Sequence, residues 1–246
     1  SGAARKAKIA VLSLVQGKNI SSWQEFHAAC KRHLLTEHHV RYFLLTDHEN
    51  TETEEGVSVI RKTFYPGPLE MLKKFETFAG MKEELQAYDY IYFLNSSLRP
   101  IAPIGEEIFP AEEERIAVAV HPEYHRLPRS MYPYENNGMS EARVPPHEGT
   151  CYLSASFMGG SANEFLCMCR ELAEAVRRDI SNGSVAGKYD ESYLNRYVIG
   201  RRPLVLGPEY LFPEEIRNNI DNLLSIKPKV KIIEKDKKLF HKRACL

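Results

Sequence analysis

The chain has 246 residues, and its 33 lysine and arginine residues balance 33 aspartate and glutamate residues. This length suits one large α/β domain, and the balanced charge gives no electrostatic reason to expect a nucleic-acid partner. No apolar run approaches the roughly 18 residues of a membrane span. The five cysteines form no disulfide pattern, which favours a reducing compartment.

Strand-like and helix-like patterns alternate through the first hundred residues. The strand patterns cover 8–15, 40–47, 57–61 and 88–94, and the helix patterns cover 21–35 and 69–86. This alternation predicts an α/β fold with a mostly parallel sheet. Ligands of such sheets bind beyond the carboxyl ends of the strands, where segments 14–19 and 95–99 lie.

The second part of the chain has a different pattern. A long loop rich in histidine, proline and tyrosine covers 121–149 and indicates a binding surface. It precedes a predicted strand over 151–157, a turn at 158–160, helices over 161–180 and 189–198, strands over 203–206 and 230–233, and a basic tail over 235–243. No internal repeat is found in the sequence, so one domain is predicted.

Asp190 and Glu191 are adjacent acids at the predicted start of a helix. One interpretation is that they complement the positive end of the helix dipole. The other is a carboxylate that faces the anomeric carbon of a sugar, as a nucleophile or as a stabiliser of an oxocarbenium-like centre. Neighbouring helical residues point in different directions, so the two acids would have different roles.

Asn95, Ser96 and Ser97 follow the predicted strand over 88–94. Neutral amide and hydroxyl groups are poor ligands for a hard dication, so no metal site is predicted there, and alone they indicate a polar turn. Basic groups would then have to balance a bound phosphate. The candidates are Lys73, Lys74 and the basic tail. Alternatively, the two lysines are ordinary surface residues, and the tail is a solvated segment without a ligand.

Several blocks occur together along the chain. They are His121-Pro122, Tyr134-Glu135, Glu148-Gly149, Gly159-Gly160, Asp190-Glu191-Ser192-x-Leu194-Asn195-x-Tyr197 and Pro208-Glu209-Tyr210-Leu211. In combination they resemble glycosyltransferase family 6, the family of the blood-group A and B transferases and the α1,3-galactosyltransferases. Looser matches in the first hundred residues extend the resemblance over nearly the whole chain.

The resemblance implies a GT-A type fold in a single domain over 5–246. Its nucleotide-binding half would be 5–100, its acceptor and catalytic half 101–234, and its basic C-terminal tail 235–246. The implied reaction is a retaining transfer of galactose or N-acetylgalactosamine from a UDP donor to a galactose-type hydroxyl, in an α1,3 linkage. Bacterial family members with a neutral Asn-x-Asn work without metal, so no cofactor is expected here, although Ser97 departs even from that motif.

Glu191 would be the catalytic carboxylate, and Asp190 would hold hydroxyls of the donor sugar. His121, Pro133 and Glu214 fall on acceptor-contacting positions, although His121 can also be a structural histidine. The remaining positions implied to contact the donor are Leu14, Val15, Gln16, Asn19, Lys74, Asn95, Ser96, Ser97, Ser154, Ala155, Ser156, Lys188, Lys237 and Arg243.

Two departures from the family pattern leave alternatives open. Lys188-Tyr189 stands where the family has Trp-His, so the identity of the acceptor molecule stays open, and Lys188 is a candidate for binding the diphosphate. The triplet Ser154-Ala155-Ser156 does not decide the donor sugar. A non-catalytic sugar or nucleotide-sugar binding relative is the first alternative, and a structural or interaction domain is the second. The expected location is the cytoplasm of a bacterial-type enzyme, unless the chain is an excised catalytic domain.

Overall fold

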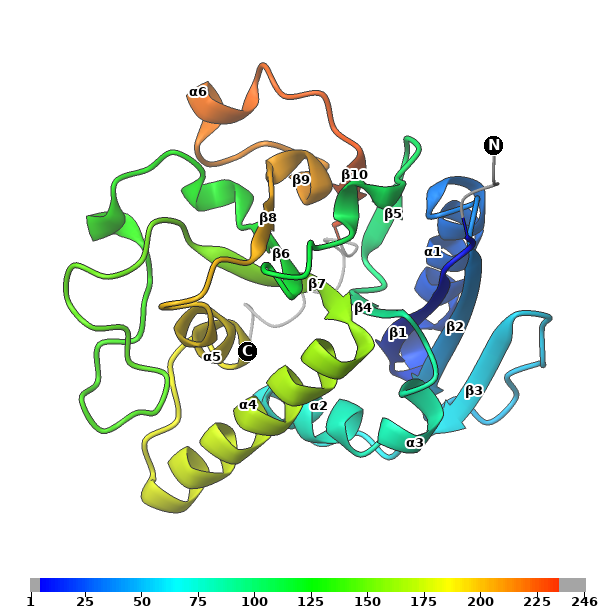
Figure 1. Ribbon diagram of the computed structural model, residues 1–246, viewed down its shortest axis with the longest axis horizontal. Helices are drawn as coiled ribbons and strands as arrows, with labels where there is room; N and C mark the ends of the chain where they lie inside the picture. Colours follow the sequence, from blue (N-terminus) through cyan, green and yellow to red (C-terminus); the bar gives the residue numbers. More distant parts are fainter. Residues whose placement is uncertain (1–4, 235–246) are drawn as a thin grey trace, which may run out of the picture.

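The computed structural model describes residues 5–234, in which strands and helices alternate (Figure 1). The strands are β1 Lys8–Val15, β2 His39–Thr46, β3 Val57–Arg61, β4 Tyr90–Leu94, β5 Leu98–Pro100, β6 Ile116–Val120, β7 Leu153–Ser161, β8 Leu204–Leu206, β9 Phe212–Pro213 and β10 Val230–Ile232. The α-helices are α1 Ile20–His33, α2 Pro68–Ala79, α3 Lys82–Leu85, α4 Ala162–Asn182, α5 Asp190–Tyr197 and α6 Ile220–Leu223.

Within this part of the chain, a seven-stranded sheet has the order β3-β2-β1-β4-β7-β6-β8, and β5, β10 and β9 form a smaller sheet. β1 is parallel to both β2 and β4, and the pairs β2–β3 and β6–β8 are also parallel. β7 is antiparallel to β4 and β6. The fold is therefore α/β with a mixed, mostly parallel central sheet. This confirms the predicted fold class and is consistent with the GT-A type.

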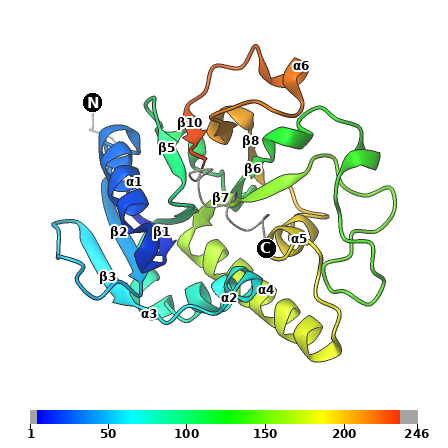
Figure 2. The same ribbon diagram turned by 180° about the vertical axis from the view of Figure 1, so that it is seen from behind.

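Two apolar clusters cover the two faces of the large sheet. Helices α2, α4 and α5 pack Phe75, Phe165 and Tyr193 against one face. Helix α1 packs Trp23 and Phe26 against the other face, where the small sheet also lies. Figures 1 and 2 show α2, α3 and α4 on the side of the sheet away from α1. The sheet is thus buried on both faces, as expected of parallel strands.

The helix boundaries follow from local chemistry. Helix α2 begins at Pro68, which has no N–H to leave unpaired, after Gly67 with a φ of 55°. Helix α4 ends at Asn182 and is capped by Gly183, which adopts the left-handed conformation at φ 67° and ψ 27° that favours glycine. None of the helices in residues 5–234 is long and apolar enough to cross a bilayer.

Two predictions about secondary structure are wrong, and one strand was missed. The predicted turn at 158–160 lies inside β7, where Gly159 and Gly160 pair with both β4 and β6. The helix predicted over 69–86 is two helices, because α2 ends at Ala79 before Gly80. The buried strand β6 precedes the loop at 121 and was not predicted, although Ile116–Val120 is entirely apolar.

Steric contacts explain why β7 has glycine at positions 159 and 160. A Cβ at Gly159 would lie 2.6 Å from the carbonyl oxygen of Ile91 and against the ring of Tyr92. A Cβ at Gly160 would lie 2.6 Å from the carbonyl oxygen of Arg115. The two glycines are therefore required by close approach of the neighbouring strands, without any turn.

Candidate active site

A cavity of about 660 Å³ opens where β1 and β4 end, a volume typical of small-molecule sites. Because β1 and β4 are neighbouring parallel strands, the residues that follow them meet at one edge of the sheet. The cavity is also bordered by the start of α2, by β7 and by the start of α5. The sequence-predicted residues that line it are Leu14, Gln16, Asn19, Lys74, Asn95, Ser96, Ala155, Ser156, Lys188, Asp190 and Glu191.

Three predicted donor residues do not line this cavity. The side chain of Val15 is buried in the apolar cluster under α1, because successive residues of β1 face opposite sides of the sheet. Ser154 is also buried, and its Oγ accepts the N–H of Ser156 at 3.2 Å. Ser97 turns toward the small sheet, where its carbonyl accepts the N–H of Ile233 at 2.9 Å.

The three predicted acceptor residues also lie outside the cavity lining. His121 lies in an aromatic cluster, with its ring centroid 5.0 Å from that of Tyr124 and 5.9 Å from that of Tyr152. Pro133 lies between two tyrosines on the same loop, and Glu214 follows β9 beside the small sheet. Lys237 and Arg243 lie outside the described residues.

Lys74 and Asp190 form an ion pair on the wall of the cavity. Both side chains are 6% exposed. The Nζ of Lys74 also donates to the carbonyl of Ala155 at 3.3 Å and lies 4.4 Å from the centroid of Phe93. Lys74 is therefore no surface lysine. Removing one partner of a buried ion pair leaves the other charge buried without compensation. Lys74 and Asp190 therefore depend on each other for their position.

Glu191, the next residue of the helix, has a different partner from Asp190. Its Oε1 accepts the hydroxyl proton of Tyr152 at 2.7 Å. Tyr152 is fully buried just before β7 and contacts the rings of Tyr124 and His121. The tyrosine hydroxyl thus fixes the carboxylate at the boundary between the cavity and the aromatic cluster.

Asn195 joins α5 to β7 and so holds the helix that carries Glu191. Its side-chain amide exchanges two hydrogen bonds with the backbone of Leu153, both 2.9 Å long. The same amide donates to the carbonyl of Glu191 at 2.9 Å. Asn195 is 1% exposed, and its donors and acceptor are all matched inside the protein, as a buried amide requires.

Burial raises the pKa of Glu191 from 4.5 to about 7, and the negative charge of Asp190 contributes to the rise. The hydrogen bond from Tyr152, a backbone hydrogen bond from Ala155 and the charge of Lys74 act in the opposite direction. Burial also lowers the pKa of His121, which the nearby positive charge of Lys188 lowers further. Perturbed carboxyl groups of this kind are typical of catalytic sites.

The residues at 95–97 do not fit a divalent metal. The Oδ1 of Asn95 accepts the N–H of Ser97 at 3.0 Å, and the carbonyl of Ser96 accepts from Ser22 and from the guanidinium of Arg99. A hard dication prefers charged oxygen ligands, and here its place would face a guanidinium cation. Among residues 5–234, no cluster of three or more histidine, cysteine or acidic side chains could hold a metal ion.

The sequence did not predict one wall of the cavity. That wall comes from the segment before α2 and the first turns of that helix and includes Phe64, Tyr65, Gly67, Glu70 and Met71. The sequence feature that could have indicated this wall is Pro66-Gly67-Pro68, which marks a turn before a helix. Tyr152 was also missed, because nothing local to its sequence shows that it contacts Glu191.

Comparisons with known proteins agree with this geometry. A model of the family "Glycosyltransferase family 6" matches residues 69–241. The chain is 26% identical to the O-antigen biosynthesis glycosyltransferase WbnI of Escherichia coli, over 93% of this chain and 94% of that protein. It is 27% identical to the globoside alpha-1,3-N-acetylgalactosaminyltransferase 1 of Homo sapiens, over 84% of this chain. It is 25% identical to the histo-blood group ABO system transferase 1 of Rattus norvegicus, over 78% of this chain.

The aligned region spans 61% of the human protein and 57% of the rat protein. Together, the α/β fold, the cavity at the strand ends and these matches define a glycosyltransferase, which takes a nucleotide-sugar donor and a glycan acceptor. The chain belongs to glycosyltransferase family 6.

Proposed function

We propose that this chain transfers galactose or N-acetylgalactosamine from UDP to a galactose-type acceptor hydroxyl, with retention, in an α1,3 linkage and without a metal. The observation that carries the proposal is the carboxylate of Glu191, which lines the cavity and is oriented by Tyr152 and Asn195. The human relative, an alpha-1,3-N-acetylgalactosaminyltransferase by name, supports the linkage and one of the two donors.

In the proposed reaction, the bond between the anomeric carbon and the β-phosphate oxygen breaks, and its electron pair leaves with UDP. The ionised Glu191 carboxylate stabilises, or briefly bonds to, the electron-poor anomeric carbon from the face opposite UDP. The acceptor hydroxyl oxygen then forms its bond to that carbon on the face that UDP has left, and any bond to Glu191 breaks with its electron pair returning to the carboxylate. The proton of the acceptor hydroxyl passes to the departing phosphate oxygen, so the configuration is retained.

Basic side chains around the cavity would stabilise the departing diphosphate. Lys18 and Lys188 both line the cavity, and within residues 5–234 neither forms an ion pair. Lys74 is already paired with Asp190. It therefore holds that acid in position, and its positive charge is largely balanced before a diphosphate binds. Lys237 and Arg243 remain proposed contributors from outside the described residues.

The donor sugar would lie between the Lys74–Asp190 pair and Glu191. Asp190 would accept hydrogen bonds from sugar hydroxyls, because its carboxylate is held at the cavity wall by Lys74. Of the triplet at 154–156, Ala155 and Ser156 line the cavity whereas the hydroxyl of Ser154 is engaged internally. Ser156 is therefore the residue proposed to contact the substituent that distinguishes the two donors.

The test is donor turnover followed by proton NMR. The protein is incubated with UDP-galactose, UDP-N-acetylgalactosamine or, as a control, UDP-glucose, each in EDTA and in Mn²⁺. UDP release is measured together with the anomer of the sugar that appears first. We expect the α anomer from at least one of the first two donors, at equal rates in EDTA and Mn²⁺.

Each other outcome contradicts a defined part of the proposal. An initial β anomer would exclude retention, and turnover that disappears in EDTA would exclude a metal-free reaction. UDP binding without turnover of any donor would favour the non-catalytic binding relative.

A further inference from the structure

Asp179 is a buried acid that the proposed reaction does not use. It lies in the last turn of α4 and is 0% exposed. A carboxylate is unfavourable there for two reasons: burial removes its hydration, and the C-terminal end of a helix dipole repels negative charge. An acid in such a position needs strong compensating contacts, and these contacts lead toward the catalytic helix.

Hydroxyl and amide donors surround this carboxylate. Its Oδ2 accepts from the hydroxyl of Ser140 at 2.7 Å and from that of Tyr193 at 2.6 Å. Its Oδ1 accepts from the N–H of Glu141 at 2.9 Å and from the hydroxyl of Ser184 at 3.2 Å. Asp179 therefore joins three segments: the loop around residue 140, the loop that follows α4, and α5.

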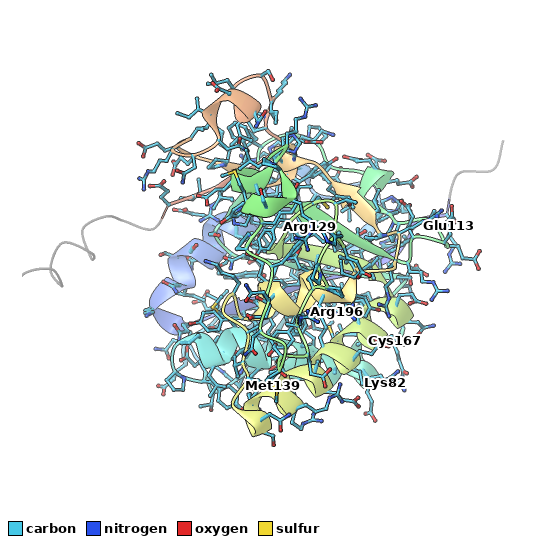
Figure 3. All side chains as sticks on the ribbon, turned by 90° about the vertical axis from the view of Figure 1, so that its left-hand side faces the viewer. Lys82, Glu113, Arg129, Met139, Cys167 and Arg196 are labelled. Carbon is cyan, nitrogen blue, oxygen red and sulfur yellow. The ribbon has the colours of Figure 1, made fainter. Side chains whose placement is uncertain are left out.

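Figure 3 shows how these segments lie. Met139 marks the loop and Arg196 marks α5, and the loop runs past α5 to the end of α4. In α5, Tyr193 is two residues after Glu191, and Arg196 is half-buried on the same helix. The contact between Tyr193 and Asp179 thus fixes the catalytic helix against the end of α4.

The segment that enters α5 is held by the same network. The hydroxyl of Tyr193 also accepts the N–H of Ala186 at 3.4 Å. The carboxylate of Glu135 accepts the N–H of Gly187 at 2.7 Å, and the hydroxyl of Ser192 accepts that of Lys188 at 3.1 Å. The backbone from 184 to 188 is therefore fixed from several sides immediately before Asp190.

Tyr189 shows that this segment is under strain. It has a φ of 53° and a ψ of −131°, although it is not glycine. Such a backbone is unfavourable for a residue with a side chain and persists only where the surroundings enforce it. The hydrogen bonds that Asp179, Glu135 and Tyr193 accept from residues 184–187 provide that enforcement directly before the two acids of the cavity.

We propose that Asp179 is a positioning residue for the catalytic carboxylate, acting through the hydroxyl of Tyr193. The inference rests on the proposed function, in which Glu191 faces the anomeric carbon. Loss of the Tyr193 contact lets α5 shift relative to β7, and with it the carboxylate of Glu191 relative to Tyr152. A displacement of about 1 Å in a catalytic group costs on the order of a hundredfold in rate.

The experiment compares Tyr193→Phe with Ser140→Ala. Each removes one hydroxyl from the same carboxylate oxygen, at nearly equal distances of 2.6 and 2.7 Å. Only the first disconnects α5. We expect similar losses in melting temperature, because each variant removes a hydrogen bond to the same charged group. We expect kcat for donor turnover to fall by about tenfold or more in Tyr193→Phe, with KM for the donor changed little, and to stay within about threefold in Ser140→Ala.

A second readout does not require turnover. Difference infrared spectroscopy between the protein and its Glu191→Gln variant gives the titration midpoint of the Glu191 carboxyl group. We expect Tyr193→Phe to move this midpoint and Ser140→Ala to leave it in place. If Tyr193→Phe does not fold, Ser184→Ala replaces it, because it disconnects the segment before α5 from the same carboxylate.

A purely structural role for Asp179 predicts that the two variants behave alike. Equal kcat values and equal titration midpoints would therefore overturn the inference while the proposed function stands. If the unmodified protein turns over no UDP-sugar, the proposed function fails instead, and the titration midpoints alone decide whether Asp179 positions Glu191.

Discussion

At the scale of single residues, the proposed chemistry depends on the ionisation of Glu191. Because burial raises its pKa to about 7, a large share of the carboxyl groups is protonated at neutral pH. A carboxylate that must stabilise a positive glycosyl centre is active only when ionised. The rate should therefore rise with pH up to about this pKa and level off above it.

Replacing Tyr152 by phenylalanine should move this dependence to higher pH. The Tyr152 hydroxyl stabilises the charged form of Glu191 and lowers its pKa. A hydrogen bond to a charged group contributes about 1.5–3 kcal/mol, so its loss raises the pKa by roughly one to two units. The pH profile of kcat/KM for donor turnover, measured for both proteins, should show the ascending limb displaced by that amount.

Tyr134→Phe is the matched control for this prediction. Its hydroxyl donates to the carbonyl of Cys151 in the same aromatic cluster, without contacting Glu191. The pH profile of Tyr134→Phe should have its ascending limb at the same pH as that of the unmodified protein. If the ascending limb of Tyr152→Phe stays at this pH as well, the hydroxyl of Tyr152 does not set the ionisation of Glu191.

At the scale of elements, β7 connects the cavity with α5, the helix that carries Glu191. It lies between β4 and β6 in the sheet, it carries Ala155 and Ser156 into the cavity, and its first residue, Leu153, is bonded to Asn195 of α5. The close packing of β4 and β6 on Gly159 and Gly160 fixes this strand.

Gly159→Ala should accordingly destabilise the protein. The new methyl group would overlap the carbonyl of Ile91 and the ring of Tyr92, and overpacking of this kind costs about 1–3 kcal/mol. For a chain of this size, the melting temperature falls by about 2–4 °C per kcal/mol. Scanning calorimetry measures the shift.

Gly138→Ala serves as the comparison, because a Cβ at this loop position meets nothing within 4 Å. Its melting temperature should stay close to that of the unmodified protein. If both alanine variants melt at the same temperature as the unmodified protein, close approach of the strands does not explain Gly159.

The secondary structure before the cavity could be predicted because it depends on local patterns. Apolar runs predicted β1, β2, β3 and β4 with small errors at the ends, and their alternation with helices predicted the parallel arrangement. Gly159 was misinterpreted because a glycine pair indicates a turn locally, whereas its cause is contact with Tyr92 on another strand. The boundary of α2 was missed because Gly80 lies inside a pattern that continues to Leu85.

At the scale of the whole molecule, the cavity joins segments that are far apart in sequence. The turn after β1, the segment before α2, the end of β4, β7 and the start of α5 all line it. From sequence alone, adjacent acids at the start of a helix can serve either the helix dipole or catalysis. Only the tertiary structure shows that Asp190 meets Lys74 and that Glu191 meets Tyr152, because pairs this distant leave no local signal.

The same cavity is lined by charges of both signs. Lys18 and Lys188 line the cavity together with Glu191, so a UDP-sugar in it would have cations available for its diphosphate and a carboxylate available for its sugar carbon. Loss of the carboxylate should thus affect the reaction far more than the binding of UDP.

The measurement that tests this account most directly is a comparison of the unmodified protein with Glu191→Gln, and with Glu174→Gln on the exposed side of α4 as a control. Glutamine keeps the shape of glutamate and can still accept the hydrogen bond of Tyr152, but it carries no charge. We expect donor turnover to fall by about a hundredfold or more while the Kd for UDP changes by less than about threefold. Full turnover in Glu191→Gln, with the control also active, would contradict the assignment of Glu191 as the catalytic carboxylate.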